Sequence, residues 1–230
     1  MEKEIVSTLI RVQDAYRAFS TLLEYYNTKE SSEKGIFEPV SIHESVVLDK
    51  SCYVGEFTVI KKNAQFGKNV KIHPQVFIGE DVTIGDGSVI LNGARILSRT
   101  EIGENCIIHP GCVIGSEGFG FAPQKDGTFK KVPQTGIVRI GNNVDIGANS
   151  TIDRATLGAT IINDGVKLDN HIQIAHNVEI GSNTVIAAQT GVAGSTKIGK
   201  SCFIGGQVGI TGHVKIGDGV QVQGLSLIHI

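Results

Sequence analysis

A period of six residues governs most of this chain. Every sixth residue from Ile42 to Ile114 is aliphatic, with Phe66 as the one aromatic member, and the same frame returns from Ile140 to Ile152. After a slip of four residues, it runs again from Ile162 to Val222. A strict hexad with an inward aliphatic side chain is typical of a parallel β-helix, in which short strands stack coil on coil. We therefore predict an all-β fold whose triangular coils contain three hexads each. Residues eighteen apart then share a column, ~4.8 Å from each other.

The residues around each inward aliphatic also repeat. Glycine often follows it, as expected where a turn needs a positive φ or the backbone approaches closely. A small or β-branched residue lies two positions before it, and this slot holds all four cysteines: Cys52, Cys106, Cys112 and Cys202. No CxxC pair is present. We therefore predict that the cysteines are small buried fillers, and not metal ligands, nucleophiles or disulfide partners.

Charge and hydropathy exclude several classes of function. The chain has 21 Lys and Arg against 23 Asp and Glu residues and no dense basic cluster, so nucleic acid is not expected as a partner. No segment approaches 18 uninterrupted apolar residues, so no transmembrane segment is expected. The N-terminal "MEKEIVSTLIRVQD" lacks the pattern of a secretory signal. We expect a cytoplasmic protein.

One insertion interrupts the hexads, at residues 115–139. Phe119 and Phe121 alternate, "QKDG" offers a turn, and Phe129 precedes two lysines, which predicts a hairpin-like arm that leaves the prism. A plain surface loop is the alternative. Three phenylalanines on a solvent loop would be wasteful, so we expect the arm to lie against a neighbouring subunit.

Both ends depart from the repeat. Within residues 1–40, "TLIRV" suggests a strand, and Asp14 suggests the N-cap of a helix with a stripe of apolar residues. One strand and one helix cannot form an independent domain. The β-helix is predicted over 41–224, and 225–230 is predicted as an atypical tail without a polar cap. We expect a fragment that lacks both ends of a longer protein.

The hexad register separates the histidines. His43, His73 and His109 follow an inward aliphatic directly, which predicts corner positions. His176 lies two residues after the inward Ile174, a slot that no other histidine occupies, and Gly194 follows it eighteen residues later.

A base beside a backbone N–H is the arrangement that acyl transfer requires, so His176 and Gly194 are the predicted base and oxyanion donor. Asp169 lies on the same coil and is the predicted carboxylate that orients the imidazole.

The segments "GVKLDNHIQIAHNVEIGSNTVIAAQTGVAGSTKIG", "GGQVGITGHVKIG" and "GSEGFGFAP" carry a more specific signal. With them, residues 5 to 222 resemble the UDP-3-O-acylglucosamine N-acyltransferases of the lipid A pathway, a family within the hexapeptide-repeat acyltransferases. The resemblance implies a left-handed β-helix that forms homotrimers with sites between chains. It also implies an N-terminal uridine-binding domain, of which only the last strand and helix are matched here.

The resemblance assigns roles to residues. It implies that His176 is the general base, that Gly194 supplies the oxyanion N–H and that His213 assists. Four further residues are expected to bind substrate: Asn170, Gln173, Phe119 and Phe121. The implied substrates are a 3-hydroxyacyl thioester of acyl carrier protein and UDP-3-O-acylglucosamine, with no metal or redox cofactor.

Three alternatives stay open. The first is another hexapeptide acyltransferase that performs UDP-sugar O-acyl transfer or CoA-dependent acetyl transfer. The second is a zinc-dependent β-helix similar to the γ-class carbonic anhydrases, with His171, His176 and His213 as ligands. In that family the isolated histidine precedes the pair, whereas here it follows, which favours the acyltransferase. The third is a non-catalytic interaction scaffold.

Overall fold

The computed structural model describes residues 10–27 and 33–228, and the chain divides into two compact units, 1–33 and 34–230. The described part of the first unit contains helix α1 (Ala15–Asn27). The Arg17 backbone N–H donates to Asp14 Oδ1 at 3.0 Å, so the predicted N-cap is confirmed. The strand expected over 8–12 is absent from its described part, 10–12, while residues 8 and 9 lie outside the described ranges.

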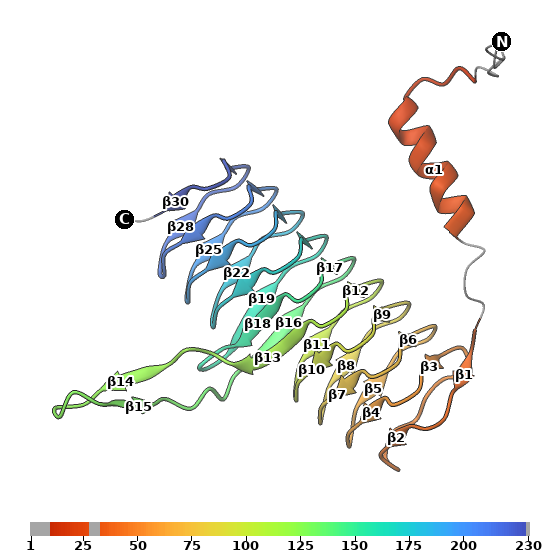
Figure 1. Ribbon diagram of the computed structural model, residues 1–230, viewed down its shortest axis with the longest axis horizontal. Coiled ribbons are helices and arrows are strands. Elements are labelled where there is room, and N and C mark those ends of the chain that lie inside the picture. Colours follow the sequence, from red (N-terminus) through yellow and green to blue (C-terminus); the bar gives the residue numbers. More distant parts are fainter. Residues whose placement is uncertain (1–9, 28–32, 229–230) are drawn as a thin grey trace, which may run out of the picture. The chain divides into compact units, whose positions relative to one another are not determined.

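The second unit is a left-handed parallel β-helix whose coils stack along one axis, so that their strands form three parallel sheets (Figure 1). Sheet A contains β1 (Gly35–Ile36), β3 (Tyr53–Val54), β6 (Lys71–Ile72), β9 (Val89–Ile90), β12 (Ile107–Ile108), β17 (Asp145–Ile146), β20 (Lys167–Leu168), β23 (Val185–Ile186), β26 (Phe203–Ile204) and β29 (Gln221–Val222). Sheet B contains β2 (Ser41–Ile42), β4 (Val59–Ile60), β7 (Phe77–Ile78), β10 (Arg95–Ile96), β13 (Val113–Glu117), β18 (Thr151–Arg154), β21 (Gln173–Ile174), β24 (Gly191–Val192), β27 (Gly209–Ile210) and β30 (Leu227–Ile228). Sheet C contains β5 (Gln65–Phe66), β8 (Thr83–Ile84), β11 (Glu101–Ile102), β16 (Ile137–Ile140), β19 (Ala159–Ile162), β22 (Glu179–Ile180), β25 (Lys197–Ile198) and β28 (Lys215–Ile216).

The register of the sheets follows the hexads. Ile84 pairs with Ile102, eighteen residues on. Ile102 pairs with Ile140 across the predicted insertion, and Ile140 pairs with Ile162 across the predicted four-residue slip. The three-hexad coil and both interruptions are therefore confirmed.

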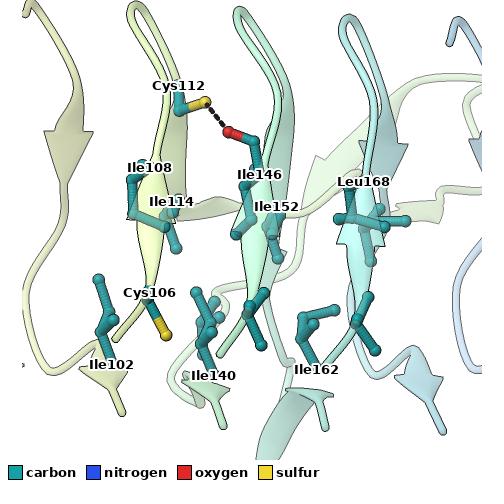
Figure 2. Close-up of a cluster of buried hydrophobic side chains, with 14 of the residues drawn as sticks. Ile102, Cys106, Ile108, Cys112, Ile114, Ile140, Ile146, Ile152, Ile162 and Leu168 are labelled. Atoms are coloured by element: carbon teal, nitrogen blue, oxygen red, sulfur yellow. Dashed lines mark hydrogen bonds between the residues drawn. The ribbon is translucent and has the colours of Figure 1, made fainter. Parts of the chain in front are cut away.

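The core of the prism is a stack of aliphatic side chains that point inward from all three sheets (Figure 2). All four cysteines are buried and free, as predicted. Their S–H groups also donate: Cys106 Sγ lies 3.1 Å from Gly141 O, and Cys112 Sγ lies 3.1 Å from Gly147 O. Burial raises the pKa of Cys112 to about 11. These thiols therefore fill the core and satisfy corner carbonyls.

The insertion is a hairpin arm, as predicted. β14 (Phe121–Pro123) pairs with β15 (Phe129–Lys131) in antiparallel fashion, and the arm projects from β13 in Figure 1. The Phe119 side chain is 84% exposed and packs edge-on against Phe121, with ring centroids 4.9 Å apart. The contact with a neighbouring subunit stays a prediction.

The prism extends beyond its predicted bounds. At its start, β1 (Gly35–Ile36) pairs with β3, six residues before the predicted boundary. At its end, β30 (Leu227–Ile228) pairs with β27. The repeat therefore continues through the described part of the tail that was expected to be atypical, because Ile228 keeps the six-residue frame.

Candidate active site

His176 lies at the corner that joins β21 of sheet B to β22 of sheet C. Its imidazole extends toward the next coil, where Gly194 occupies the equivalent position. A Cβ added to Gly194 would lie 2.7 Å from both Cε1 and Nε2 of His176. The predicted juxtaposition is confirmed, and glycine is required at 194 for the imidazole to occupy this place.

The backbone N–H of Gly194 belongs to the second residue after the inward Val192. At several equivalent corner positions this N–H donates to a side-chain oxygen on the next coil: Lys68 donates to Asp86 at 2.8 Å, and Glu80 donates to Ser98 Oγ at 3.3 Å. The coil after Gly194 presents Gly212 there, and within the described residues no acceptor is recorded for the Gly194 N–H. The Gly194 N–H therefore lies beside the imidazole with no acceptor recorded among the described residues. Such an open donor suits an oxyanion.

Asn177 orients the His176 ring. Its Oδ1 lies 3.2 Å from His176 Nδ1 and accepts the Thr156 N–H at 3.0 Å, while its Nδ2 donates to Leu157 O at 2.9 Å. Because the Asn177 amide uses its NH2 on a carbonyl, its oxygen faces the ring. The neutral imidazole then carries its proton on Nδ1 and its lone pair on Nε2, the edge that faces Gly194. No role for Asn177 was predicted from the sequence, although it directly follows His176.

The base of the arm covers the other side of the imidazole. A Cβ on Gly118 would lie 2.9 Å from His176 Cβ. Arg154, which precedes His176 by one coil, holds this segment: its Nε donates to Gly115 O at 2.6 Å and its Nη2 to Ser98 O at 3.2 Å. His176 is therefore enclosed between two glycines, one from the arm and one from the prism.

His213 belongs to the same corner, two coils along. Its backbone N–H donates to Gly194 O at 3.1 Å. His171 precedes β21, at its opposite end from His176. The zinc alternative shares its three histidines between chains, and within one chain His171 and His176 lie at opposite ends of β21. Among the described residues, no three His, Cys, Asp or Glu side chains are grouped to hold a metal ion.

Within one chain, Asp169 lies at the opposite end of β21 from His176, and its predicted orienting role stays a prediction. Asp169 Oδ1 accepts the Asn170 N–H at 2.7 Å, and its Oδ2 accepts the Ala188 N–H at 3.1 Å. Asn170 is engaged at this corner too, because its Oδ1 accepts the Ala148 N–H at 2.7 Å. This corner joins sheets A and B and lines a separate cavity of about 490 Å³. The two positions share a coil, but the width of sheet B separates them.

A different carboxylate, Asp153, lies near His176. It is 8% exposed, and its oxygens accept from Ser116 Oγ at 2.9 Å and from Gln173 Nε2 at 3.0 Å. Burial raises the pKa of Asp153, against these two hydrogen bonds and the nearby His176, which lower it.

Asp153 and Gln173 line a cavity of about 970 Å³, whose wall also includes Phe119 and Phe121. Three of the four predicted substrate-binding residues, Gln173, Phe119 and Phe121, thus line one cavity, and Asn170 lies elsewhere. The floor of this cavity is built from small residues of sheet B and the adjoining corner: Ala175, Gly191, Ala193 and Gly209.

Together, the described site offers a base, an open N–H donor and an apolar groove beside them. Such a site can accept a proton, stabilise an anionic tetrahedral oxygen and hold an alkyl chain, which are the requirements of group transfer on a β-helix. The model for bacterial transferase hexapeptide repeats matches residues 63–98, 81–116, 159–194 and 195–229, and that for the hexapeptide repeat of succinyl-transferase matches 137–175. The chain belongs to the bacterial hexapeptide transferase family.

Several curated relatives are similar over most of the chain. A UDP-3-O-acylglucosamine N-acyltransferase of Christiangramia forsetii is 56% identical over 196 residues, which is 85% of this chain and 58% of the relative. One from Porphyromonas gingivalis is 55% identical over 194 residues, 84% of this chain and 55% of the relative. The chain thus spans just over half the length of these relatives.

Solved structures with the same fold include a UDP-N-acetylglucosamine O-acyltransferase from Moraxella catarrhalis, at 28% identity and a TM-score of 0.68, covering 84% of this chain and 66% of that one. An Arabidopsis UDP-N-acetylglucosamine acyltransferase, at 23% identity, has a TM-score of 0.75 over 83% of this chain and 66% of that one. In the described part of the chain, no helix is long and apolar enough to cross a membrane.

Proposed function

We propose that the chain is the β-helix part of a cytoplasmic N-acyltransferase. It moves a 3-hydroxyacyl group from acyl carrier protein to the 2-amino group of UDP-3-O-acylglucosamine. The observation that carries this proposal is the position of His176 Nε2 beside the open N–H of Gly194. The relatives at 55–56% identity, each named for this acceptor, support it over most of the chain.

In the proposed reaction, the amine nitrogen attacks the thioester carbonyl carbon. His176 Nε2 takes the amine proton, and the Gly194 N–H holds the oxygen that becomes negative. The C–S bond then breaks, the new C–N bond stays as an amide, and the proton on His176 passes to the departing thiolate. His213, two coils along the same corner, assists with the bound acceptor.

We propose a homotrimer for the active form. Sheet A carries exposed apolar side chains, Ile107, Val185 and Phe203, whereas sheet C carries ion pairs such as Glu101 with Arg139 and Glu179 with Lys197. An apolar face favours contact between copies, and a charged face favours solvent. Light scattering checks this, and a fully active monomer would exclude it.

The experiment that tests the function offers the purified chain two acceptors with the same 3-hydroxyacyl carrier protein. We expect an amide on UDP-3-O-acylglucosamine and no ester on UDP-N-acetylglucosamine, as resolved by mass spectrometry of the products. Ester formation would favour the O-acyltransferase alternative. A chain that transfers to neither acceptor would favour the scaffold.

A further inference from the structure

Gln134 is a buried polar residue on the returning segment of the arm, just before β16. It is 4% exposed, and both ends of its side-chain amide are engaged. Its Nε2 donates to Val132 O at 3.0 Å, and its Oε1 accepts the Thr156 hydroxyl at 2.7 Å. A buried amide is costly unless its polar atoms are paired. These two hydrogen bonds therefore hold the Gln134 side chain in one orientation, with its oxygen toward Thr156.

The outgoing segment of the arm lies against the same amide. A Cβ on Gly120 would lie 2.6 Å from Gln134 Nε2, and the Val132 N–H donates to Gly120 O at 2.9 Å. Gly118, two residues earlier, lies against His176. The arm therefore contacts the imidazole with one glycine and the Gln134 amide with the next.

Thr156 belongs to the four-residue slip, because residues 155–158 join β18 to β19. At other corners, the third residue after the inward aliphatic donates its N–H to a backbone carbonyl of the preceding coil, as Ser195 does to His176 O at 2.9 Å. Asn177 holds this position on the coil after the slip, and its N–H donates instead to the Thr160 hydroxyl at 2.9 Å. The slip therefore replaces a regular hydrogen bond of the prism at the corner that carries His176.

The slip loop holds the Asn177 side chain at both ends of its amide. The Thr156 N–H donates to Asn177 Oδ1 at 3.0 Å, and Asn177 Nδ2 donates to Leu157 O at 2.9 Å. Asn177 Oδ1 in turn lies 3.2 Å from His176 Nδ1. One chain of contacts thus runs from Gln134 in the arm, through Thr156 and Asn177, to the imidazole.

On these grounds, and resting on the proposed role of His176 as base, we propose that Gln134 is a positioning residue for the imidazole. It holds Thr156 where Asn177 Oδ1 can accept the Nδ1–H of the ring, so the lone pair of Nε2 stays on the edge that faces Gly194. The arm thereby sets the tautomer of the base, and the four-residue slip is the part of the prism that transmits this effect. Gln134 acts through these two residues and takes no part in proton transfer.

The test reads the tautomer of His176 by long-range proton–nitrogen NMR on the full chain with isotope-labelled histidine and no substrate. Spectra are recorded at about pH 8, above the ordinary range of imidazole titration. The His176 signals are those that disappear in His176→Ala.

Four variants separate the hydrogen bonds from the bulk of the side chains. Gln134→Met keeps the bulk and removes both hydrogen bonds, and Thr156→Val removes only the hydroxyl, which Thr156→Ser retains. Thr135→Val is the matched control, because its hydroxyl also donates to the slip loop, to Thr156 O at 3.2 Å, but its side chain is exposed. If Gln134→Met fails to fold, Thr156→Val carries the test, because Thr156 is only half-buried.

We expect the neutral His176 ring to carry its proton on Nδ1 in the wild-type chain, in Thr156→Ser and in Thr135→Val. In Gln134→Met and Thr156→Val, part of the signal moves to the Nε2–H form. In these two variants kcat for amide formation falls about two- to tenfold with KM unchanged, the factor that corresponds to one hydrogen bond.

A wild-type ring with its proton on Nε2 would overturn the inference, as would a wild-type tautomer in both Gln134→Met and Thr156→Val. An equal shift in Thr135→Val would also overturn it, since any change to the loop would then move the ring. If the tautomers follow the expected pattern but no amide forms with UDP-3-O-acylglucosamine, the proposed function fails while the positioning role of Gln134 stands.

Discussion

At the residue scale, two glycines set the space available to His176. A Cβ at Gly194 would collide with the imidazole at 2.7 Å, so Gly194→Ala displaces the ring or the backbone that carries the N–H. We predict a fall in acyl-transfer kcat of about 10²-fold or more, the size seen when an oxyanion donor is lost. Gly217→Ala is the matched control, because a Cβ there meets nothing within 4 Å. Equal activity of the two variants would contradict this geometry.

The buried thiol of Cys112 predicts a pH dependence of stability. Its pKa is raised to about 11 in the folded chain, so the folded state holds the proton more tightly than the unfolded state. The associated stability is fully present below pH ~9 and is lost as the pH rises through the folded pKa. Between pH 8 and 10.5 we expect wild type to lose about 2 kcal/mol more than Cys112→Ser in urea unfolding. Parallel pH profiles would refute this.

The sequence was sufficient for His176 and Gly194 because an eighteen-residue register aligns them. For Asp169 the prediction relied on nearness within a coil, and this does not give nearness across a sheet face within one chain. Asp153 was missed for a related reason: it lies 22 residues before Ala175, and the four-residue slip hides their shared column. An alignment of the coils that allowed for the four-residue slip would have placed Asp153 in the column of Ala175. The Asn177 contact needs side-chain geometry, which no period supplies.

At the element scale, the arm depends on one side chain at its base. Arg154 donates to the carbonyls of Gly115 and Ser98, and partial burial lowers its pKa. We predict that Arg154→Met raises amide exchange over 115–121 at least tenfold, because hydrogen bonds from a charged donor are lost. Hydrogen-exchange mass spectrometry measures this. Arg139→Met is the control, since its pair with Glu101 is exposed and surface pairs contribute ~0–1 kcal/mol. Equal exchange in both variants would contradict the anchoring role.

Elements were predicted well wherever the hexad ran. Most strands of the prism have two residues and end at the inward aliphatic, and the longer ones (β13, β16, β18 and β19) flank the two interruptions. The "QKDG" stretch marked the arm's turn correctly. The start of the prism was placed too late, because Gly35–Ile36 joins sheet A one hexad before the repeat becomes regular in sequence. The strand expected near the N-terminus had no partner strand to pair with among the described residues, and propensity alone does not form a sheet.

At the scale of the whole molecule, the prism is a stack in which each coil contacts its neighbours. A cavity in the middle of such a stack weakens coils on both sides, whereas one at the end affects a single interface. We predict that Ile146→Ala, at a fully buried central site, costs about 2–5 kcal/mol in urea unfolding. Ile216→Ala, near the end of the described prism and 8% exposed, should cost less. Equal costs would show that the stack does not behave as coupled neighbours.

The same stacking accounts for function. The sheets hold a corner in which His176 and Asn177 lie on one coil and Gly194 lies on the next, and the base of the inserted arm lies beside them. The most direct test is the rate of amide formation by His176→Ala at saturating concentrations of both substrates. We predict a fall of ~10² to 10⁴-fold, the usual contribution of a general base, with the fold intact by circular dichroism. Near-normal turnover by this variant would contradict the assignment of His176 as the base.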